Sequence, residues 1–482
     1  MNRRQFLKSA TALGAALPPL IAQSKRPLNF VFILADDLGW TDLSSYGSTF
    51  YETPNIDRLA AQGTRFTNAY AACPVCSPTR ASIMTGKYPA RLGITNYLPG
   101  RHPTPYSKLI AQDCVQQLPL EETTLAEALK SAGYATGQFG KWHLGGPQYS
   151  PEHQGFDKVF SPPRGAANYF YPGWREANPP IEGKPGEYIT DRLAEEAAAF
   201  IQQNRERPFF VYLPHFAPHV PLEAKKEYIA KYAGKIRSGA RQNDPIYAGM
   251  IQSLDESVGK ILATLEANNL TSNTVVIFNS DNGGLNAPEW KLKPTTSNWP
   301  LREGKGHVYE GGIRVPLIVR GPGIRKGVVD DTPISSIDHF PTLTEMAGLP
   351  ASTRSGIDGI SYASLLTSGH ALPHRPLYWH YPHYSNQLGR PASAVRLGEY
   401  KLILFHEDRH VELYNLKADI QEENDLATKQ PAKAAELSKL LDIWLKEMKA
   451  KFPEPNPNYD AVREAEGYWW KQPGAYERFG KQ

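Results

Sequence analysis

Cysteine and net charge are both scarce in this chain. Three cysteines in 482 residues do not suggest a disulfide framework, because folds held together by disulfides use many more. A formal net charge of +4 is too small for a polybasic surface, so we expect no nucleic acid as a partner. With 41% hydrophobic and 21% charged residues, the composition is that of a globular protein, and 482 residues are enough for one large and one small domain.

The N-terminus has the features of an export signal. Arg3 and Arg4 precede an apolar, alanine-rich run over about residues 10–22, which is too short to span a membrane as a mature helix. The pattern resembles a twin-arginine signal peptide over residues 1–22, with Asn2 in place of the more usual Ser or Thr. Its removal would delete Arg3, Arg4 and Lys8, which lowers the formal charge from +4 to about +1. We therefore expect an exported, periplasmic or extracellular protein without stable membrane insertion.

Two apolar runs lead into side chains that carry oxygen donors. Residues 29–34 and 274–278 are nearly continuous apolar runs, which is typical of strands buried on both faces. The oxygen donors that follow them are Asp36, Asp37, Asp281 and Asn282. Because the carboxyl ends of strands in an open α/β sheet meet in one crevice, these two corners could lie together. Three carboxylates and one amide carbonyl suit a hard cation, and the flexible coordination of Ca²⁺ fits better than the strict octahedron of Mg²⁺.

Other segments place reactive side chains close to predicted strands or helices. The stretch Cys76-Ser77-Pro78-Thr79-Arg80 is followed by Thr85-Gly86, and taken alone it also fits a free cysteine beside a helix-starting proline. Lys141 and His143 follow a predicted strand over residues 134–139, and two residues apart on an extended segment they point to the same side. The remaining candidates are His215 and His219, after an apolar run at 209–213, and Lys305, ahead of Glu310 and Arg314.

Taken together, these segments resemble the motifs of the type I, arylsulfatase-like sulfatases of the alkaline phosphatase superfamily, over about residues 29–366. The resemblance implies that a maturation enzyme converts Cys76 to Cα-formylglycine, whose hydrated aldehyde attacks the sulfur of a sulfate ester. It also implies a set of calcium ligands: Asp36, Asp37, Asp281, Asn282 and the formylglycine oxygen at position 76. The catalytic groups that it implies are Cys76, Arg80, Lys141, His143, His219 and Lys305.

The resemblance also implies a role for each group. Arg80 would hold the nucleophile and the metal ligands in place, and Lys141, Lys305 and Ca²⁺ would offset the charge on the sulfate oxygens. Asp281 would take the proton of the attacking hydroxyl, and His219 with Lys305 would protonate the leaving alkoxide. His143 would then remove the second hydroxyl proton, releasing sulfate. We interpret Glu310 and Arg314 as an ion pair that orders the loop carrying Lys305, and the role of His215 stays open.

The order of strand-like and helical patterns predicts the fold. Residues 29–366 alternate apolar runs with helical patterns at 55–61, 125–132, 190–203 and 247–267, which favours a doubly wound, mixed, largely parallel sheet. The resemblance implies the alkaline-phosphatase-like fold. Strand candidates at 394–396, 401–405 and 412–415 and an amphipathic helix at 432–449 predict a small antiparallel sheet with one helix. We expect a catalytic domain over 23–370 and a C-terminal subdomain over 371–482, whose aromatic tail lies against the body.

Loops around the sulfate pocket are expected to select the substrate. Residues 164–174, 294–302 and 379–384 mix aromatic with polar side chains, which favours a sulfated carbohydrate over a small aryl sulfate. Three other functions stay open. A phosphate or phosphonate ester hydrolase of the same superfamily would share the sheet and the metal corner. A non-catalytic receptor for sulfated glycans requires an unmodified Cys76 and has no need of proton-transfer groups, and a structural surface protein fits the set of motifs poorly.

Overall fold

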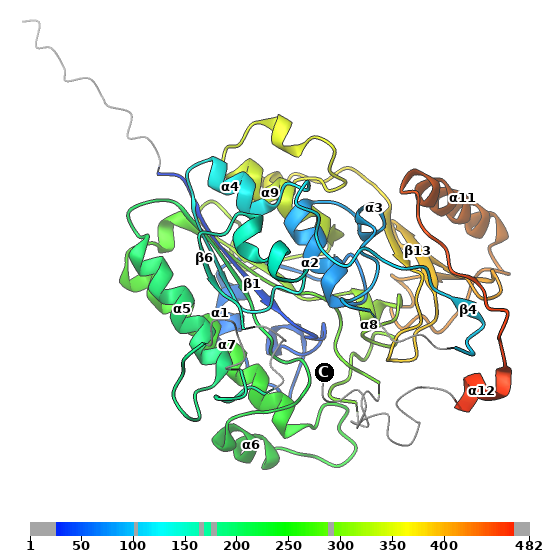
Figure 1. Cartoon of the computed structure of the whole chain (residues 1–482), viewed down its shortest axis with the longest axis horizontal. Helices are drawn as coiled ribbons and strands as arrows, with labels where there is room; N and C mark the ends of the chain where they lie inside the picture. The colour runs from blue at the N-terminus through cyan, green and yellow to red at the C-terminus, as the bar shows by residue number, and fades with distance from the viewer. Residues whose placement is uncertain (1–25, 101–104, 163–167, 175–180, 288–293, 467–482) are drawn as a thin grey trace, which may run out of the picture.

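A mixed eight-stranded sheet forms the centre of the computed structural model, which describes residues 26–100, 105–162, 168–174, 181–287 and 294–466 (Figure 1). The strand order is β10-β2-β9-β8-β1-β7-β5-β6. The strands are β1 (Asn29–Ala35), β2 (Thr64–Phe66), β5 (Ala135–Phe139), β6 (Lys158–Phe160), β7 (Phe209–Pro214), β8 (Thr274–Ser280), β9 (Leu317–Arg320) and β10 (Val328–Asp330). Strand β9 runs antiparallel to β2 and β8, whereas β1, β5, β6, β7 and β8 pair in parallel. The predicted largely parallel sheet is confirmed.

Helices cover both faces of this sheet (Figure 1). One face carries α1 (Pro54–Ala61), α5 (Ile189–Gln203) and α7 (Pro245–Ala267), and the other carries α2 (Cys76–Thr85), α4 (Leu125–Ser131) and α9 (His339–Met346). Alternate residues of β1 enter the two cores, Val31 and Ile33 on the side of α7 and Phe32 on the side of α2. Burial on both sides explains why this strand is a continuous apolar run. The four helices predicted from periodicity match within two residues.

Shorter elements connect these layers. The helices are α3 (Pro89–Leu92), α6 (Lys226–Ala233), α8 (Glu310–Ile313), α10 (Ala363–Ser368) and α12 (Ala461–Glu466). Short strand pairs join β3 (Ala69–Tyr70) to β11 (Ile334–Ser335), and β4 (Leu109–Ile110) to β16 (Glu454–Pro455). No helix in the described part of the chain is both long and apolar enough to cross a membrane. Among the described residues, Cys73, Cys76 and Cys114 form no disulfide, and the structure has none of the disulfide framework that the sequence argued against.

A second, antiparallel sheet follows the eight-stranded sheet along the chain. Its strands are β12 (Leu377–Tyr381), β13 (Ala392–Leu397), β14 (Tyr400–Phe405) and β15 (Val411–Asn415), and α11 (Pro431–Glu447) packs on one face (Figure 1). The opposite face packs against residues of the catalytic region such as Val75 and Ile313. The predicted small sheet with one helix is therefore confirmed.

The sequence interpretation missed β12 and was wrong to place residues 379–381 in a substrate loop. Trp379 is only 1% exposed, and its indole Nε1 donates a hydrogen bond to the carbonyl oxygen of Ala71 at 2.8 Å. Leu377, Trp379 and Tyr381 alternate along the strand and point into the interface between the two sheets. Their aromatic character reflects this buried packing rather than contact with a substrate.

The described part of the C-terminal tail lies against the body. Strand β16 pairs with β4, and the Asn456 amide donates hydrogen bonds to the carbonyl oxygens of Pro105 and Ser107 at 2.9 and 2.7 Å. Residues 467–482, with most of the tail's aromatic side chains, lie outside the described residues, as does the predicted signal peptide at 1–22.

Buried histidines make the C-terminal subdomain sensitive to acid. The His380 ring donates from Nε2 to the Lys451 carbonyl oxygen at 2.9 Å and accepts from Ser393 at 2.7 Å, and Ser393 accepts from His406 at 3.0 Å. Burial lowers the pKa of His380 to about 4 and that of His406 to about 3. These folded-state pKa values lie below the usual value near 6.5, so the stability that they contribute is present above pH 6.5 and is lost as the pH falls.

We expect the free energy of unfolding to fall by about 2 kcal/mol per buried histidine between pH 7.5 and pH 5.0. Urea unfolding of the wild type and of His380→Gln at both pH values measures this effect, because the variant removes one titrating ring. The pH-dependent loss should be about 2 kcal/mol smaller in His380→Gln. The exposed His370 provides the matched control, and His370→Gln should behave as the wild type. An identical loss in His380→Gln and the wild type would contradict this account.

Candidate active site

The two acidic corners predicted from the sequence lie side by side. Strands β1 and β8 are parallel neighbours with Ala35 opposite Ser280, so both chains turn at the same edge of the sheet. The Asp37 backbone N–H donates to the Asp281 carboxylate at 3.2 Å, and the Asn282 amide donates to the Asp37 carboxylate at 2.8 Å. All four side chains in this acidic cluster are buried: Asp36, Asp37, Asp281 and Asn282.

Cys76 faces this cluster from the first residue of α2. Its sulfur and one oxygen each of Asp36 and Asp281 lie within 4.8 Å of one another. The thiol is 2% exposed and lies 3.3 Å from Nδ1 of His143. Helix α2 therefore brings the candidate nucleophile to the position where the two strands end.

Arg80, one helical turn after Cys76, joins α2 to the segments that follow β8 and β5. Its Nε and Nη2 donate to one oxygen of Asp281 at 2.9 and 2.6 Å, and its Nη1 donates to the carbonyl oxygen of Lys141 at 2.9 Å. The guanidinium is fully buried, and such a charge is stable only when it is paired and hydrogen-bonded. Arg80 thus fixes the distance between the cysteine and the acidic cluster.

Two lysines and a histidine complete the site. The Lys141 ammonium lies 2.5 Å from a carboxylate oxygen of Asp36, and the Lys305 ammonium lies 2.7 Å from one of Asp37. Lys305 also donates to Nε2 of His219 at 3.1 Å. The His219 side chain is 28% exposed, so the site opens toward solvent beside this ring.

The backbone takes unusual conformations at two of these residues. Asp37 has φ 62° and His143 has φ 59°, in the left-handed region that residues other than glycine rarely enter. Such strain clusters at functional sites because the surrounding contacts hold it in place. The extended segment assumed for Lys141 and His143 is therefore wrong, since β5 ends at Phe139 and a turn brings both side chains to the site.

The acidic cluster fits a metal ion. The Asp36 Oδ1 and Asn282 Oδ1 atoms are buried and accept no hydrogen bond from the described residues. Burial and the neighbouring Asp36 raise the pKa of Asp281 to about 7, which reflects carboxylates crowded together. Buried polar atoms without a partner are costly, and a hard cation would satisfy both oxygens and relieve the repulsion. Residues that could hold it are Asp36, Asp37, Asp281, Asn282 and position 76.

The hydrogen bonds of the two histidines assign their tautomers. His143 donates from Nε2 to the Leu98 carbonyl oxygen at 2.6 Å, which leaves Nδ1 as an acceptor facing Cys76. His219 donates from Nδ1 to the Val220 carbonyl oxygen at 2.5 Å, which leaves Nε2 as the acceptor for Lys305. Burial, together with Lys141 for His143 and Lys305 for His219, lowers the pKa of both rings. Both are therefore neutral proton acceptors near neutral pH.

The family model described as Sulfatase matches residues 28–349, about two thirds of the chain. The chain belongs to the sulfatase family. A second model, described as N-sulphoglucosamine sulphohydrolase, C-terminal, matches residues 303–451 and so includes the antiparallel sheet and α11. This sulfatase is thus a sulfuric ester hydrolase with the alkaline-phosphatase-like fold.

Relatives of this sulfatase cover nearly its full length. A protein of Formosa agariphila named Sulfatase is 33% identical, with 90% of this chain and 92% of the relative covered. The N-acetylgalactosamine-6-sulfatase of Rattus norvegicus is 36% identical, with 81% of this chain and 74% of the relative covered. The crystal structure of Ps i-CgsB in complex with k-i-k-neocarrahexaose has a TM-score of 0.75 and 31% identity, covering 92% of this chain and 97% of that chain.

Other predicted residues of the sulfatase lie outside the site or support it. His215 is fully buried and bonded to the Ser257 hydroxyl at 2.9 Å, and burial lowers its pKa to about 3, so its role is structural. Glu310 and Arg314 form the predicted ion pair, with a 2.6 Å contact. Of the expected substrate loops, residues 163–167 are outside the described part of the chain, and Trp299 of the 294–302 loop is 51% exposed.

Sequence reasoning missed Asp42, which orders the turn that carries Asp36 and Asp37. Its carboxylate accepts hydrogen bonds from the Gly39 N–H, the Tyr247 hydroxyl and the Thr296 hydroxyl at 2.8, 2.7 and 2.6 Å. These partners lie more than 200 residues away in sequence, except for Gly39. The signal in the sequence was only an acid five residues after Asp37, a common surface pattern.

Proposed function

We propose that this sulfatase hydrolyses sulfate esters of a carbohydrate, with a formylglycine at position 76 and a calcium ion as its cofactors. The observation that carries the proposal is the convergence of Cys76 with an acidic cluster and two buried lysines on one edge of the sheet. A hydrated formylglycine supplies a hydroxyl nucleophile and a second hydroxyl whose deprotonation expels sulfate, which neither serine nor cysteine can do.

The acidic cluster is proposed to hold the calcium ion through Asp36, Asp37, Asp281 and Asn282, with the formylglycine oxygen as a further ligand. A calcium ion held there would supply a Lewis acid for a sulfate oxygen. The three carboxylates of the cluster face three cations, Arg80, Lys141 and Lys305. A divalent cation therefore makes the site positive overall, which suits a sulfate monoester that carries one negative charge.

The two lysines are proposed to bind the sulfate group. Lys141 and Lys305 are 7% and 5% exposed, and each is held by a carboxylate of the acidic cluster. Because both ammonium groups are already held in place, little free energy is needed to orient them when negative charge spreads over the sulfate oxygens. Arg80, which touches Asp281 and the Lys141 carbonyl oxygen, positions the nucleophile and the ligands rather than the substrate.

Proton transfers are assigned from the directions of the hydrogen bonds. The free Nδ1 of His143 faces position 76, so His143 is proposed to remove the second hydroxyl proton when sulfate leaves. His219 and Lys305 share a hydrogen bond on the open side, and we assign this pair the protonation of the leaving alcohol, with the Lys305 ammonium as the proton donor and His219 as the acceptor that orients it. Asp281, one oxygen of which lies within 4.8 Å of the Cys76 sulfur, is proposed to take the proton of the attacking hydroxyl.

A sulfated carbohydrate is the proposed substrate class. The relatives named N-acetylgalactosamine-6-sulfatase and the neighbour bound to k-i-k-neocarrahexaose support it. The exposed Trp299 offers an aromatic surface close in sequence to Lys305, and the Arg241 guanidinium lies 4.2 Å from the centroid of its ring.

We also propose export through the twin-arginine-type signal at 1–22, after a maturation enzyme has acted on Cys76. The proposed domains are 23–370 and 371–482.

Mass spectrometry of the tryptic peptide over residues 66–80, from protein purified out of its native host, tests the proposal. This peptide contains both Cys73 and Cys76, so Cys73 is an internal control. After iodoacetamide treatment we expect one alkyl group, on Cys73, and a loss of about 18 Da at Cys76, the difference between a thiol and an aldehyde. Two alkyl groups in active protein would instead favour the phosphoester hydrolase, and in inactive protein the glycan receptor.

A further inference from the structure

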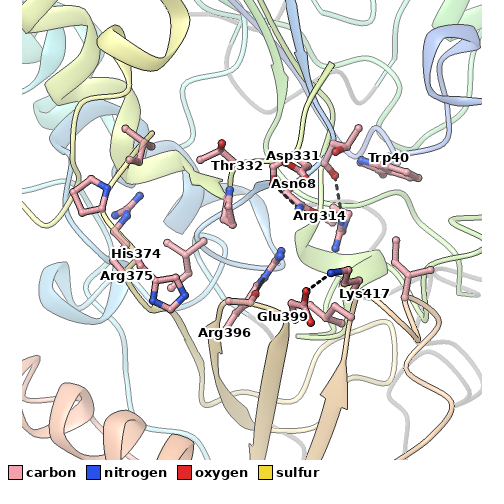
Figure 2. A pocket seen from close by; sticks show the side chains of 18 residues that line it. Trp40, Asn68, Arg314, Asp331, Thr332, His374, Arg375, Arg396, Glu399 and Lys417 are labelled. Carbon is pink, nitrogen blue, oxygen red and sulfur yellow. Dashed lines mark hydrogen bonds and ion pairs between the residues drawn. The ribbon is translucent and has the colours of Figure 1, made fainter. Parts of the chain in front are cut away.

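A cavity of about 540 Å³ lies between the catalytic region and the antiparallel sheet (Figure 2). Its wall includes Trp40, Arg314, Thr332, Arg375 and Arg396, and we call it the Arg396 cavity. Among the described residues, none of the acidic cluster or of the catalytic groups lines it. It is therefore a second hollow, separate from the active site.

Three guanidinium groups from different segments border the Arg396 cavity (Figure 2). Arg314 pairs with Glu310 at 2.6 Å, and Arg375 pairs with Asp338. Arg396 is only 7% exposed, and within the described residues no carboxylate lies within ion-pair distance of it. Its Nε donates to the Gly398 carbonyl oxygen at 3.1 Å and its Nη1 donates to the Tyr70 hydroxyl. Arg396 thus brings a buried charge without an opposite partner to the cavity.

The charged groups around Tyr70 do not balance the positive charge of Arg396. The Tyr70 hydroxyl donates to Glu310 at 2.7 Å, and Lys401 lies 2.9 Å from both Glu310 and Glu422. The buried charge cluster therefore contains two carboxylates and three cations: Glu310, Glu422, Arg314, Arg396 and Lys401. Burial raises the pKa of Glu422 to about 7, so the positive excess is larger when this carboxyl is protonated. Buried charge of one sign is costly, and an anion in the cavity would offset it.

The remaining wall offers the groups that bind a sugar. The indole Nε1 of Trp40 is buried and has no hydrogen-bond partner among the described residues, and the guanidinium of Arg314 lies 5.9 Å from the ring centroid. Asn68 and Thr332 add an amide and a hydroxyl to the lining. The volume lies within the range of small-molecule sites and is larger than a bare oxyanion needs. Of the two carboxylates in the lining, Glu399 pairs with Lys417 at 2.7 Å and Asp331 is exposed. An aromatic ring, neutral polar groups and an arginine that pairs with no carboxylate among the described residues suit an acidic saccharide.

We propose that the Arg396 cavity is a second, non-catalytic site that binds an acidic saccharide, with a carboxylate or sulfate group on the Arg396 guanidinium and the ring against Trp40. The choice of a saccharide rests on the proposed function, whereas the anion on Arg396 rests on the buried charge cluster alone. Free sulfate, the product of the reaction, shares this oxyanion chemistry and is the alternative source. A second site of this kind would hold a polymeric substrate while the active site acts on it.

Isothermal titration calorimetry with an unsulfated uronic acid disaccharide tests the proposal, because this probe carries no sulfate ester for the active site. In sulfate-free and phosphate-free buffer we expect the enzyme to bind it at one site. Arg396→Gln should weaken binding at least about tenfold, and Arg396→Lys, which keeps the charge, should weaken it less. Thr332→Trp, which fills the cavity and leaves Arg396 in place, should also weaken it. Arg237→Gln, on the exposed surface, is the matched control and should bind as the wild type.

No binding to the wild type, or binding to Arg396→Gln and Thr332→Trp as tight as to the wild type, would overturn the proposal. Binding of sodium sulfate as tight as that of the disaccharide, and dependent on Arg396, would mean a site for the ion alone and would also overturn it. A neutral disaccharide should not bind. Turnover of a small aryl sulfate should be unchanged in Thr332→Trp. If the wild type did not hydrolyse sulfate esters, the proposed function would be rejected. Calorimetry would still show whether the Arg396 cavity binds the disaccharide.

Discussion

Replacement of Cys76 by alanine is expected to reduce turnover of sulfate esters at least about 10⁴-fold, because it removes the nucleophile and no neighbouring group can replace it. The side chain loses one buried sulfur atom in a position held by Arg80 and the hydrogen bonds of α2, so the fold and the acidic cluster should remain. Initial rates on a small aryl sulfate, with circular dichroism as the check of folding, measure the effect.

Cys73→Ala is the matched control for this experiment. Cys73 is equally buried, lies three residues from Cys76 and is hydrogen-bonded to the Thr95 carbonyl oxygen rather than to a residue of the site. Its replacement leaves a small cavity in the core, which costs stability but not chemistry. Turnover by Cys76→Ala equal to that of Cys73→Ala would defeat the mechanism.

Removal of the proposed calcium ion is expected to lower turnover at least about 100-fold, because a bound metal would both polarise the sulfate and relieve the repulsion among the three carboxylates. Dialysis against a chelator, followed by rates with added Ca²⁺ or Mg²⁺ and by metal analysis, measures this. Ca²⁺ should restore the rate more fully than Mg²⁺, since Ca²⁺ takes many protein oxygens at once, whereas Mg²⁺ usually keeps several waters and binds one or two carboxylates. Full turnover in protein shown to be free of metal would contradict the assignment.

The amide ligand can be tested separately. Asn282→Ala should raise the calcium concentration needed for half-maximal rate, because the buried Oδ1 atom without a hydrogen-bond partner is then lost. Asn286→Ala is the control, since Asn286 is a nearby amide that bonds only weakly to the Glu303 carbonyl oxygen at 3.4 Å. The two variants should differ in calcium dependence even if both change the maximal rate.

Sequence patterns correctly predicted those parts of the fold and the site that depend on residues close together in the sequence. The run before Asp36 and the run before Asp281 identified β1 and β8, and the rule that parallel strands share an edge placed their carboxyl ends together. The cysteine and Arg80 sit one helical turn apart on α2, so their joint approach to the acidic cluster also follows from short-range geometry.

Contacts between distant segments could not be predicted in this way. Strand β12 was missed because its aromatic residues gain their buried setting only when the antiparallel sheet docks on the catalytic region. Asp42 looked like a surface acid because its partners Tyr247 and Thr296 are remote in sequence. The Arg396 cavity depends on three segments that no periodicity connects.

The buried charge cluster has a consequence for how such chains can recombine. Glu310 begins α8, five residues after Lys305, and one of its two ion-pair partners, Lys401, is a residue of β14. A chimaera that took its antiparallel sheet from another sulfatase would need Lys401, or it would bury Glu310 with less compensation beside the loop that carries Lys305. The two sheets are therefore expected to be inherited as a unit, and an exchange between relatives should succeed only where the junction carries matching charges.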